Sequence, residues 1–270
     1  IEETSFLIDN VVVTANKYAT KQKEVATIVN VVSPLIIEST ASNSMADVLN
    51  FQTGLRVEET CSNCGVPQIR INGLEGQYTQ ILMDSRPIFS SLASVYGIEQ
   101  LPAGMVDRIE VIRGGGSALY GANAIAGVVN IITKEPTRNF FNVSNSSAFT
   151  EQGTYDINTN LNASVVAENQ KAGIYLFGVQ RNRQQYDRDE DGFSDIPHLN
   201  STTAGFRSFF KTSEYSKLTA EYHHTTEYRR GGYGIDSLQP HESPLCEQLR
   251  HNIDAATAKW DMYTADSRHF

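Results

Sequence analysis

Residues 106–134 have the sequence VDRIEVIRGGGSALYGANAIAGVVNIITK, and this stretch decides the fold. Its first eight residues are rich in β-branched side chains and predict a strand, and the three glycines from Gly114 predict a turn. The segment SALYGANA predicts a short helix, and GVVNIITK predicts a second strand that ends before Pro136. The stretch therefore predicts a strand, a glycine turn, a helix and a strand in mixed α/β structure.

A glycine turn between a strand and a helix also occurs at phosphate sites, so a nucleotide site is an alternative. Counted from Gly114, the dinucleotide fingerprint Gly-x-Gly-x-x-Gly fails at its last position, which is Leu119. The Gly-Lys-Ser/Thr of a P-loop is also missing. The sequence disfavours a nucleotide site here.

The composition excludes some classes of protein. The 270 residues include 22 Lys and Arg against 31 Asp and Glu, a net charge of -9, whereas nucleic-acid binding usually shows as a basic patch. No apolar run reaches the roughly 18–20 residues of a membrane-spanning helix, but barrel strands give a much weaker signal. Residues 1–4 lack the basic start and apolar core of a signal peptide, so an exported form would be a processed chain. No grouping of nucleophile, base and acid predicts an enzyme.

The 106–134 stretch resembles the end of the plug domain of TonB-dependent outer-membrane receptors. Those plugs carry R-I-E-V-x-R-G-x-x-S-A-L-Y-G-x-x-A-I-x-G-V-x-N-I-I-T-K, and nearly every position is filled from Arg108 onward. Residues 68–74 and 80–84 are similar to two further plug strands, with Asn72 in place of an arginine and Ser85 in place of a glycine. The resemblance implies an α+β plug domain followed by antiparallel transmembrane β-barrel strands.

From residue 139 onward the sequence alternates between apolar and polar side chains with period two, which indicates strands with one apolar face. We expect six strands, at 139–149, 154–167, 171–185, 200–211, 215–229 and 250–263. The connections after the third and fifth strands are long. If the plug enters the first strand from the periplasm, both long connections lie outside the cell, as outer-membrane barrels require.

These patterns divide the chain into three parts: a lead-in at 1–15, a plug at 16–138 and barrel strands at 139–270. Within the plug part, the sequence also predicts a helix at 45–52, which ends at Gly54. The family closes its barrel with about 22 strands, and six cannot close. We therefore expect a truncated barrel.

The lead-in holds a short apolar strand, whose sequence is DNVVVTA. Extended segments of this kind bind by adding to an exposed sheet edge, although the alternative is a strand packed permanently in the plug. The segment resembles the TonB box of cobalamin receptors, which implies TonB and its inner-membrane proton-motive complex as partners. We expect this box to be weakly held, and it comprises Asp9, Asn10, Val11, Val12, Val13, Thr14 and Ala15.

An acidic segment in the first long connection matches the first half of a calcium loop. Carboxylates at alternate positions project oxygens to one side, and a glycine at the sixth position permits the sharp turn. The twelfth position is His198 instead of glutamate, so the EF-hand assignment fails, and a solvated acidic loop is the alternative. The candidate ligands are Asp187, Asp189, Asp191, Asp195 and the carbonyl of Phe193.

Cys61 and Cys64 form Cys-Ser-Asn-Cys-Gly, and Cys246 stands alone. A zinc site would need two more ligands with suitable spacing, and none follows. In an oxidising compartment the pair predicts a short-loop disulfide, with Cys246 left as a free thiol.

Substrate contacts in these receptors come from the outer loops of the plug and the inner wall of the barrel. By that resemblance the loops are residues 60–67 and 89–97, and His241 in an outer connection offers an axial ligand for haem iron. A surface loop with merely solvated side chains is the alternative. The candidate contacts are Ser62, Asn63, Phe89, Ser90, Ser91, Ser94, Tyr96 and His241.

The resemblance implies a TonB-dependent receptor in the outer membrane of a Gram-negative bacterium that imports a metal chelate, with no required cofactor. The LNFQTGLRVEE and RINGLEG segments and the Cys-x-x-Cys loop resemble those of haem receptors, whereas the box resembles that of cobalamin receptors. We expect haem as the chelate, with cobalamin or a ferric siderophore as the alternative. Outer-membrane lipid, and a surface lipoprotein, are expected neighbours. A different class is a surface adhesin with a β-sandwich stiffened by calcium.

Overall fold

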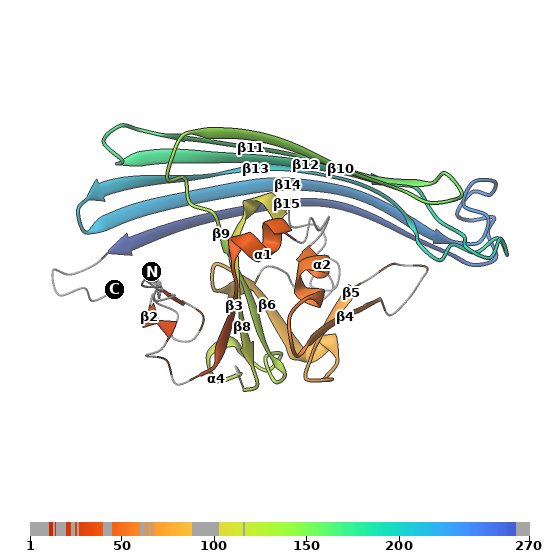
Figure 1. Cartoon of the computed structure of the whole chain (residues 1–270), viewed down its shortest axis with the longest axis horizontal. Coiled ribbons are helices and arrows are strands. Elements are labelled where there is room, and N and C mark those ends of the chain that lie inside the picture. Colours follow the sequence, from red (N-terminus) through yellow and green to blue (C-terminus); the bar gives the residue numbers. More distant parts are fainter. Residues whose placement is uncertain are drawn as a thin grey trace, which may run out of the picture.

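A computed structural model describes residues 11–12, 14, 20–22, 25, 27–39, 45–59, 63, 65, 67–87, 103–115 and 117–262. A broad antiparallel sheet of long strands lies over a smaller α/β unit, which packs against one face of that sheet (Figure 1). This is the predicted fold class, a plug followed by barrel strands.

The α/β unit is built on a five-stranded sheet with the order β3-β8-β9-β6-β7. Only β6 and β9 pair in parallel, and the other neighbours are antiparallel. The decisive stretch forms two strands joined through a glycine turn and a short helix, as predicted, and the structure places these strands side by side within this sheet. Gly114 supplies the turn with φ 82°. The strands and the short helix are β3 Val29–Val32, β6 Thr79–Met83, β7 Arg86–Pro87, β8 Val106–Arg113, α4 Ser117–Tyr120 and β9 Gly127–Thr133.

Smaller elements surround this sheet. Helix α2 ends at Asn50, earlier than predicted, because Phe51 N and Gln52 N bond three residues back, to Val48 O and Leu49 O, and so tighten the chain into a turn. The elements are β1 Val11–Val12, β2 Thr20–Lys21, α1 Pro34–Ser39, α2 Met45–Asn50, β4 Leu55–Glu59, β5 Pro67–Ile71, η2 Gly76–Tyr78 and η3 Ala103–Met105. None of the helices among the described residues is long and apolar enough to cross a membrane.

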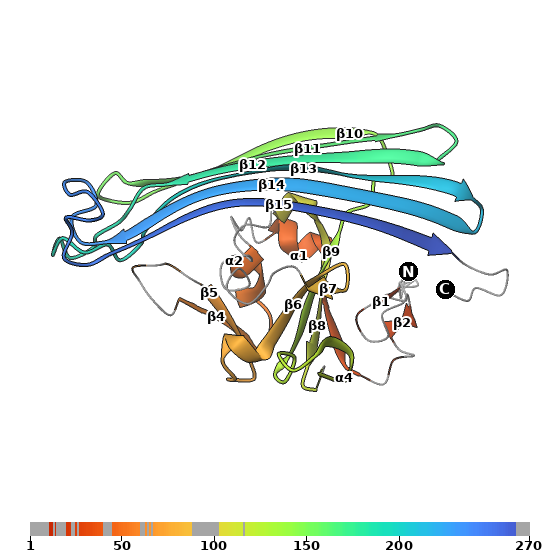
Figure 2. The ribbon, with the colours of Figure 1, turned by 180° about the vertical axis from the view of Figure 1, so that it is seen from behind.

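The broad sheet contains six strands in sequence order, and each is antiparallel to the next. All six were predicted, and β13, β14 and β15 are longer than expected. They are β10 Phe140–Phe149, β11 Tyr155–Val166, β12 Ala172–Arg183, β13 His198–Ser213, β14 Ser216–Gly232 and β15 Cys246–Met262. The two long connections, which follow β12 and β14, lie together at one end, and β1 and β2 lie toward the other end, near the tight turns (Figure 2).

The two faces of the broad sheet differ in polarity. On β11, Leu161 and Val165 point away from the plug and are exposed, whereas Asn158, Asn162 and Ser164 point toward it and are buried. Large aromatic side chains are also exposed on the outer face, such as Phe141, Phe149 and Trp260. An apolar outer face with aromatic side chains and a polar inner face is typical of an outer-membrane barrel.

The inner face of the sheet shares one core with the plug. Tyr175 and Phe177 of β12 are buried in the same cluster as Met45 and Leu49 of α2 and Ile109 of β8. The broad sheet therefore packs through its inner face on the helices and strands of an α/β unit. The β-sandwich alternative is wrong for this reason.

Candidate functional site

The described part of the N-terminal segment is docked on the plug. Strand β1 pairs with β2 through Val11 to Lys21 and Val12 to Thr20. The Val12 side chain is fully buried, in a cluster with Leu82 and other plug residues. The expectation of a weakly held segment is therefore wrong for Val12 and Thr14. The other members of the predicted box lie outside the described residues: Asp9, Asn10, Val13 and Ala15.

Thr14 sits in a buried socket, which we call the Thr14 socket, formed by Glu110, Tyr120 and Asn130. Oε2 of Glu110 accepts both the Thr14 N–H at 2.8 Å and the Thr14 hydroxyl at 2.6 Å. Asn130 Nδ2 donates to Thr14 Oγ1 at 2.8 Å, and the Tyr120 hydroxyl donates to Thr14 O at 2.7 Å. Every hydrogen-bonding group of Thr14 thus has a plug partner.

The chemistry of Tyr120 and Glu110 fits the hydrogen bonds of the Thr14 socket. Burial raises the pKa of Tyr120, which keeps its hydroxyl a donor. The other oxygen of Glu110 accepts from Arg108 at 2.9 Å, which compensates the buried charge. Sequence analysis missed this socket, although Glu110 and Asn130 are polar residues inside apolar strands, and that was the available signal.

A two-residue turn connects β6 to β7 beside this socket. Met83 pairs with Arg86, so Asp84 and Ser85 form the turn, and both have positive φ, 47° and 67°. Such turns favour glycine at the second position, so Ser85 is strained there. Asn130 compensates, because its Oδ1 accepts the Ser85 N–H at 2.9 Å and its Nδ2 donates to Ser85 Oγ at 3.2 Å.

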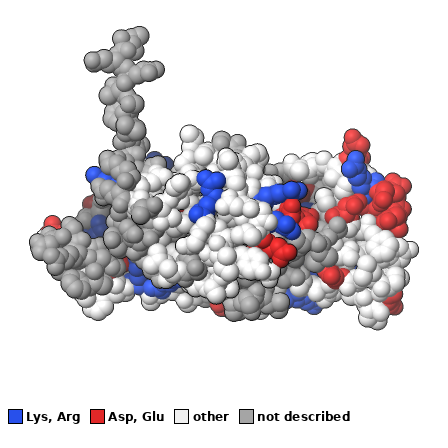
Figure 3. Space-filling view, turned by 90° about the horizontal axis from the view of Figure 1, so that it is seen from below, with Lys and Arg blue, Asp and Glu red and all other residues white. Residues whose placement is uncertain are grey.

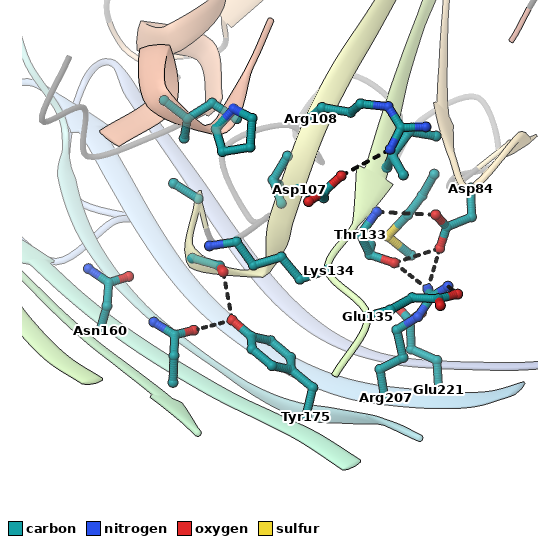
Figure 4. Close-up of a pocket in the computed structure, with 18 of the residues that line it drawn as sticks. Asp84, Asp107, Arg108, Thr133, Lys134, Glu135, Asn160, Tyr175, Arg207 and Glu221 are labelled. Carbon is teal, nitrogen blue, oxygen red and sulfur yellow. Dashed lines mark hydrogen bonds and ion pairs between the residues drawn. The ribbon is translucent and has the colours of Figure 1, made fainter. Parts of the chain in front are cut away.

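The Asp84 carboxylate faces the other way, toward the wall of the broad sheet (Figure 4). It accepts from Thr133 N at 3.1 Å and from Thr133 Oγ1 at 2.7 Å, and it forms an ion pair with Arg207 of β13. Arg207 also pairs with Glu221 of β14 at 2.8 Å, and Glu135 lies 3.8 Å from it. This cluster ties the plug to the inner wall.

A second contact joins the plug to β14 near the long connections. The Arg229 guanidinium donates to Gly65 O and pairs with Glu227 at 3.2 Å. Gly231 lies so close that an added Cβ would stand 1.9 Å from Asn63 O, so only glycine fits. Asn63 is therefore placed at the wall. The other predicted members of this loop, Cys61, Ser62 and Cys64, lie outside the described residues, as do Phe89, Ser90, Ser91, Ser94 and Tyr96.

The acidic connection is only partly assembled as predicted. Carboxylate oxygens of Asp187, Asp189 and Asp195 lie within 4.8 Å of one another. Asp191 is not in this group, and its Oδ1 instead accepts the Phe193 N–H at 2.8 Å. Acidic side chains gather at the end of the molecule with the long connections (Figure 3), where His241 is also exposed. Cys246 is a free thiol, as expected.

A protein-family model matches part of the N-terminal portion of the chain. Residues 21–128 match the TonB-dependent receptor plug domain. The vitamin B12 transporter BtuB of Vibrio vulnificus (strain CMCP6) is 37% identical over 125 residues, which are 46% of this chain and 20% of that protein. The ferric enterobactin receptor PirA of Pseudomonas aeruginosa is 42% identical over 80 residues, or 26% of this chain and 11% of that protein.

Solved structures extend the likeness to the whole fold. The siderophore receptor PirA of Acinetobacter baumannii has a TM-score of 0.69 at 19% identity, over 88% of this chain and 38% of that one. The ferripyoverdine receptor of Pseudomonas aeruginosa has a TM-score of 0.72 at 14% identity, over 96% of this chain and 35% of that one.

The chain spans about a fifth of the B12 transporter and little more than a third of these structures. These four relatives are named as transporters and receptors, for vitamin B12 and for siderophores. Residues 21–128 therefore match a TonB-dependent receptor plug domain, and the plug match, the plug-and-wall architecture and these relatives together support a TonB-dependent receptor.

Proposed function

We propose that this chain is the plug and first part of the barrel of an importer that takes a metal chelate across the outer membrane of a Gram-negative bacterium. The observation that carries the proposal is the arrangement of the plug. It packs on the polar inner wall of a sheet whose outer face is apolar, and its N-terminal segment docks toward the end with the tight turns. In this assignment residues 1–15 are the lead-in, 16–138 the plug and 139–270 barrel strands.

The segment from Asp9 to Ala15 is the TonB box in this proposal. TonB would bind it by strand addition, which needs free backbone N–H and C=O groups. In the docked state β1 pairs with β2 and Thr14 fills its socket, so TonB must compete with these contacts. The box is thus a held strand that becomes available on undocking.

The transported chelate is proposed to be cobalamin, a ferric siderophore or haem. The relatives from Vibrio and Pseudomonas favour the first two, since they are named for vitamin B12 and ferric enterobactin. Two of the predicted substrate contacts lie among the residues that the structure describes, near the long connections. They are Asn63 and the exposed His241. Titrating the full-length receptor with cyanocobalamin, ferric enterobactin and haem separates the three.

A calcium ion bound by Asp187, Asp189 and Asp195 is a further part of the proposal, since a divalent cation would offset the repulsion among these carboxylates. It would order the connection between β12 and β13. The protein requires no cofactor for transport itself in this proposal.

The box is tested by Val12→Pro in the full-length gene, with uptake and substrate binding both measured in cells. Proline removes the N–H that strand addition needs, so uptake should be lost while binding is retained. Val12→Ala is the matched control, because it removes side-chain packing but keeps the N–H, and it should retain uptake. Undiminished uptake by Val12→Pro would refute the assignment.

A further inference from the structure

One buried amide joins the Thr14 socket to the plug turn that reaches the barrel wall. The Asn130 side chain is fully buried, and its two ends bond both Thr14 and Ser85. Ser85 follows Asp84, whose carboxylate is held by Arg207 of β13. A continuous path therefore runs from the inner wall to the docked N-terminal segment, through the Arg207–Asp84 ion pair, the peptide link from Asp84 to Ser85 and the hydrogen bonds of Asn130.

We propose that Asn130 and the turn at Asp84 and Ser85 form a relay, through which the state of Arg207 sets how firmly Thr14 is docked. The inference rests on the proposed function for its meaning in transport. The relay itself is a property of the fold, and it can be measured without TonB and without substrate.

The turn is the element of the relay that can change state. Two consecutive non-glycine residues with positive φ persist only when their surroundings hold them. On one side the holders are Arg207 and Thr133, which bind the Asp84 carboxylate. On the other side the holder is Asn130, which bonds both the backbone and the hydroxyl of Ser85.

Releasing one side of the turn therefore weakens the other. Without Arg207 the Asp84 carboxylate loses its ion pair, and the strained backbone relaxes away from Asn130. Asn130 then has no fixed orientation, and Thr14 loses the donor to its hydroxyl oxygen at 2.8 Å. A charged group that enters the lumen and binds Arg207 would compete with Asp84 and act in the same direction.

The relay is tested by the accessibility of residue 12 in the full-length receptor. A thiol in Val12→Cys is buried when the segment is docked and reacts with a maleimide when it is undocked, so the labelling rate reports the undocked fraction. Tryptic cleavage at Lys17 separates this thiol from Cys61, Cys64 and Cys246, so mass spectrometry counts it alone.

In this background Arg207→Gln should raise the labelling rate at least about fivefold, as expected for loss of a charge-assisted contact. Arg181→Gln is the matched control, because Arg181 also faces inward and pairs at 2.7 Å with Asp156, which lies on β11 of the wall and not on the plug. It should label within about twofold of the parent. Thr133→Val, which keeps every charge, should shift the rate in the same direction as Arg207→Gln.

Asn130→Leu separates a relay from independent effects. It should itself raise labelling, and Arg207→Gln added to it should raise labelling no further. Three outcomes would each overturn the relay. The first is unchanged labelling in both Arg207→Gln and Thr133→Val, and the second is an equal rise in Arg181→Gln. The third is a double variant in which the effects of Asn130→Leu and Arg207→Gln multiply. A failed uptake test of Val12→Pro would remove the TonB box and leave this measurement unaffected.

Discussion

Glu110→Gln should release Thr14 from the plug while leaving the plug folded. In the native protein one oxygen of Glu110 accepts two bonds from Thr14, at 2.8 and 2.6 Å, and the other accepts from Arg108 at 2.9 Å. Glutamine has one amide oxygen and one NH2 group. If the oxygen stays with Thr14, the NH2 faces the guanidinium, and in the opposite orientation it faces the Thr14 N–H.

The magnitude follows from these contacts. Hydrogen bonds to a charged group are worth about 1.5–3 kcal/mol each, against about 1 kcal/mol for neutral ones. Glu110→Gln neutralises the acceptor of two hydrogen bonds from Thr14 and sets the new NH2 group against another donor. Together these changes should make the free energy of docking less favourable by about 2–3 kcal/mol. That is about a 30- to 150-fold rise in the undocked fraction.

Hydrogen exchange of the Thr14 amide is the assay, read by mass spectrometry on the full-length receptor, because this N–H donates to Glu110. Glu58→Gln is the control, since Glu58 pairs with Arg56 at 2.9 Å and Arg70 at 2.6 Å on a separate hairpin. It should leave Thr14 exchange unchanged. Exchange in Glu110→Gln within about twofold of wild type would refute the socket as the element that holds this segment.

Two further predictions concern the end with the long connections. Gly231→Ala should destabilise the full-length receptor to thermal unfolding by about 1–3 kcal/mol, because its Cβ would collide with Asn63, whereas Gly178→Ala, with its nearest atom 4.0 Å away, should change little. If calcium binds the acidic connection, chelator or Asp189→Asn should weaken substrate affinity in a titration. Asp191→Asn should not, since Asp191 lies outside the cluster. Equal substrate affinity with calcium and with chelator would contradict this prediction and indicate that the connection is an ordinary solvated loop.

The elements of this fold were predictable because their signals are local. Alternation of side chains along 154–167 gives β11 to within a residue, since a strand with one lipid-facing side repeats every second residue. The β8 and β9 strands followed equally from β-branched runs separated by glycine.

The docking of the N-terminal segment could not be predicted in the same way. Thr14 bonds residues that lie 96, 106 and 116 positions away, and no spacing rule reaches so far. The turn at Asp84 shows the same limit. The sequence showed serine where the family has glycine, but only the structure shows that Asn130 compensates the positive φ of Ser85.

The position of β3 in its sheet has a mechanical consequence. Strand β3 is the edge strand, paired only with β8, and it is the first strand of the five-stranded sheet reached by a pull on the N-terminus. It runs across the direction of the barrel strands, so tension along the barrel would open its hydrogen bonds one after another (Figure 1). Strand β9, which leads directly into β10 of the wall, would be loaded last. Force applied at the N-terminus would then peel the plug from its edge, and the paired strands next to the wall would serve as the anchor from which it refolds.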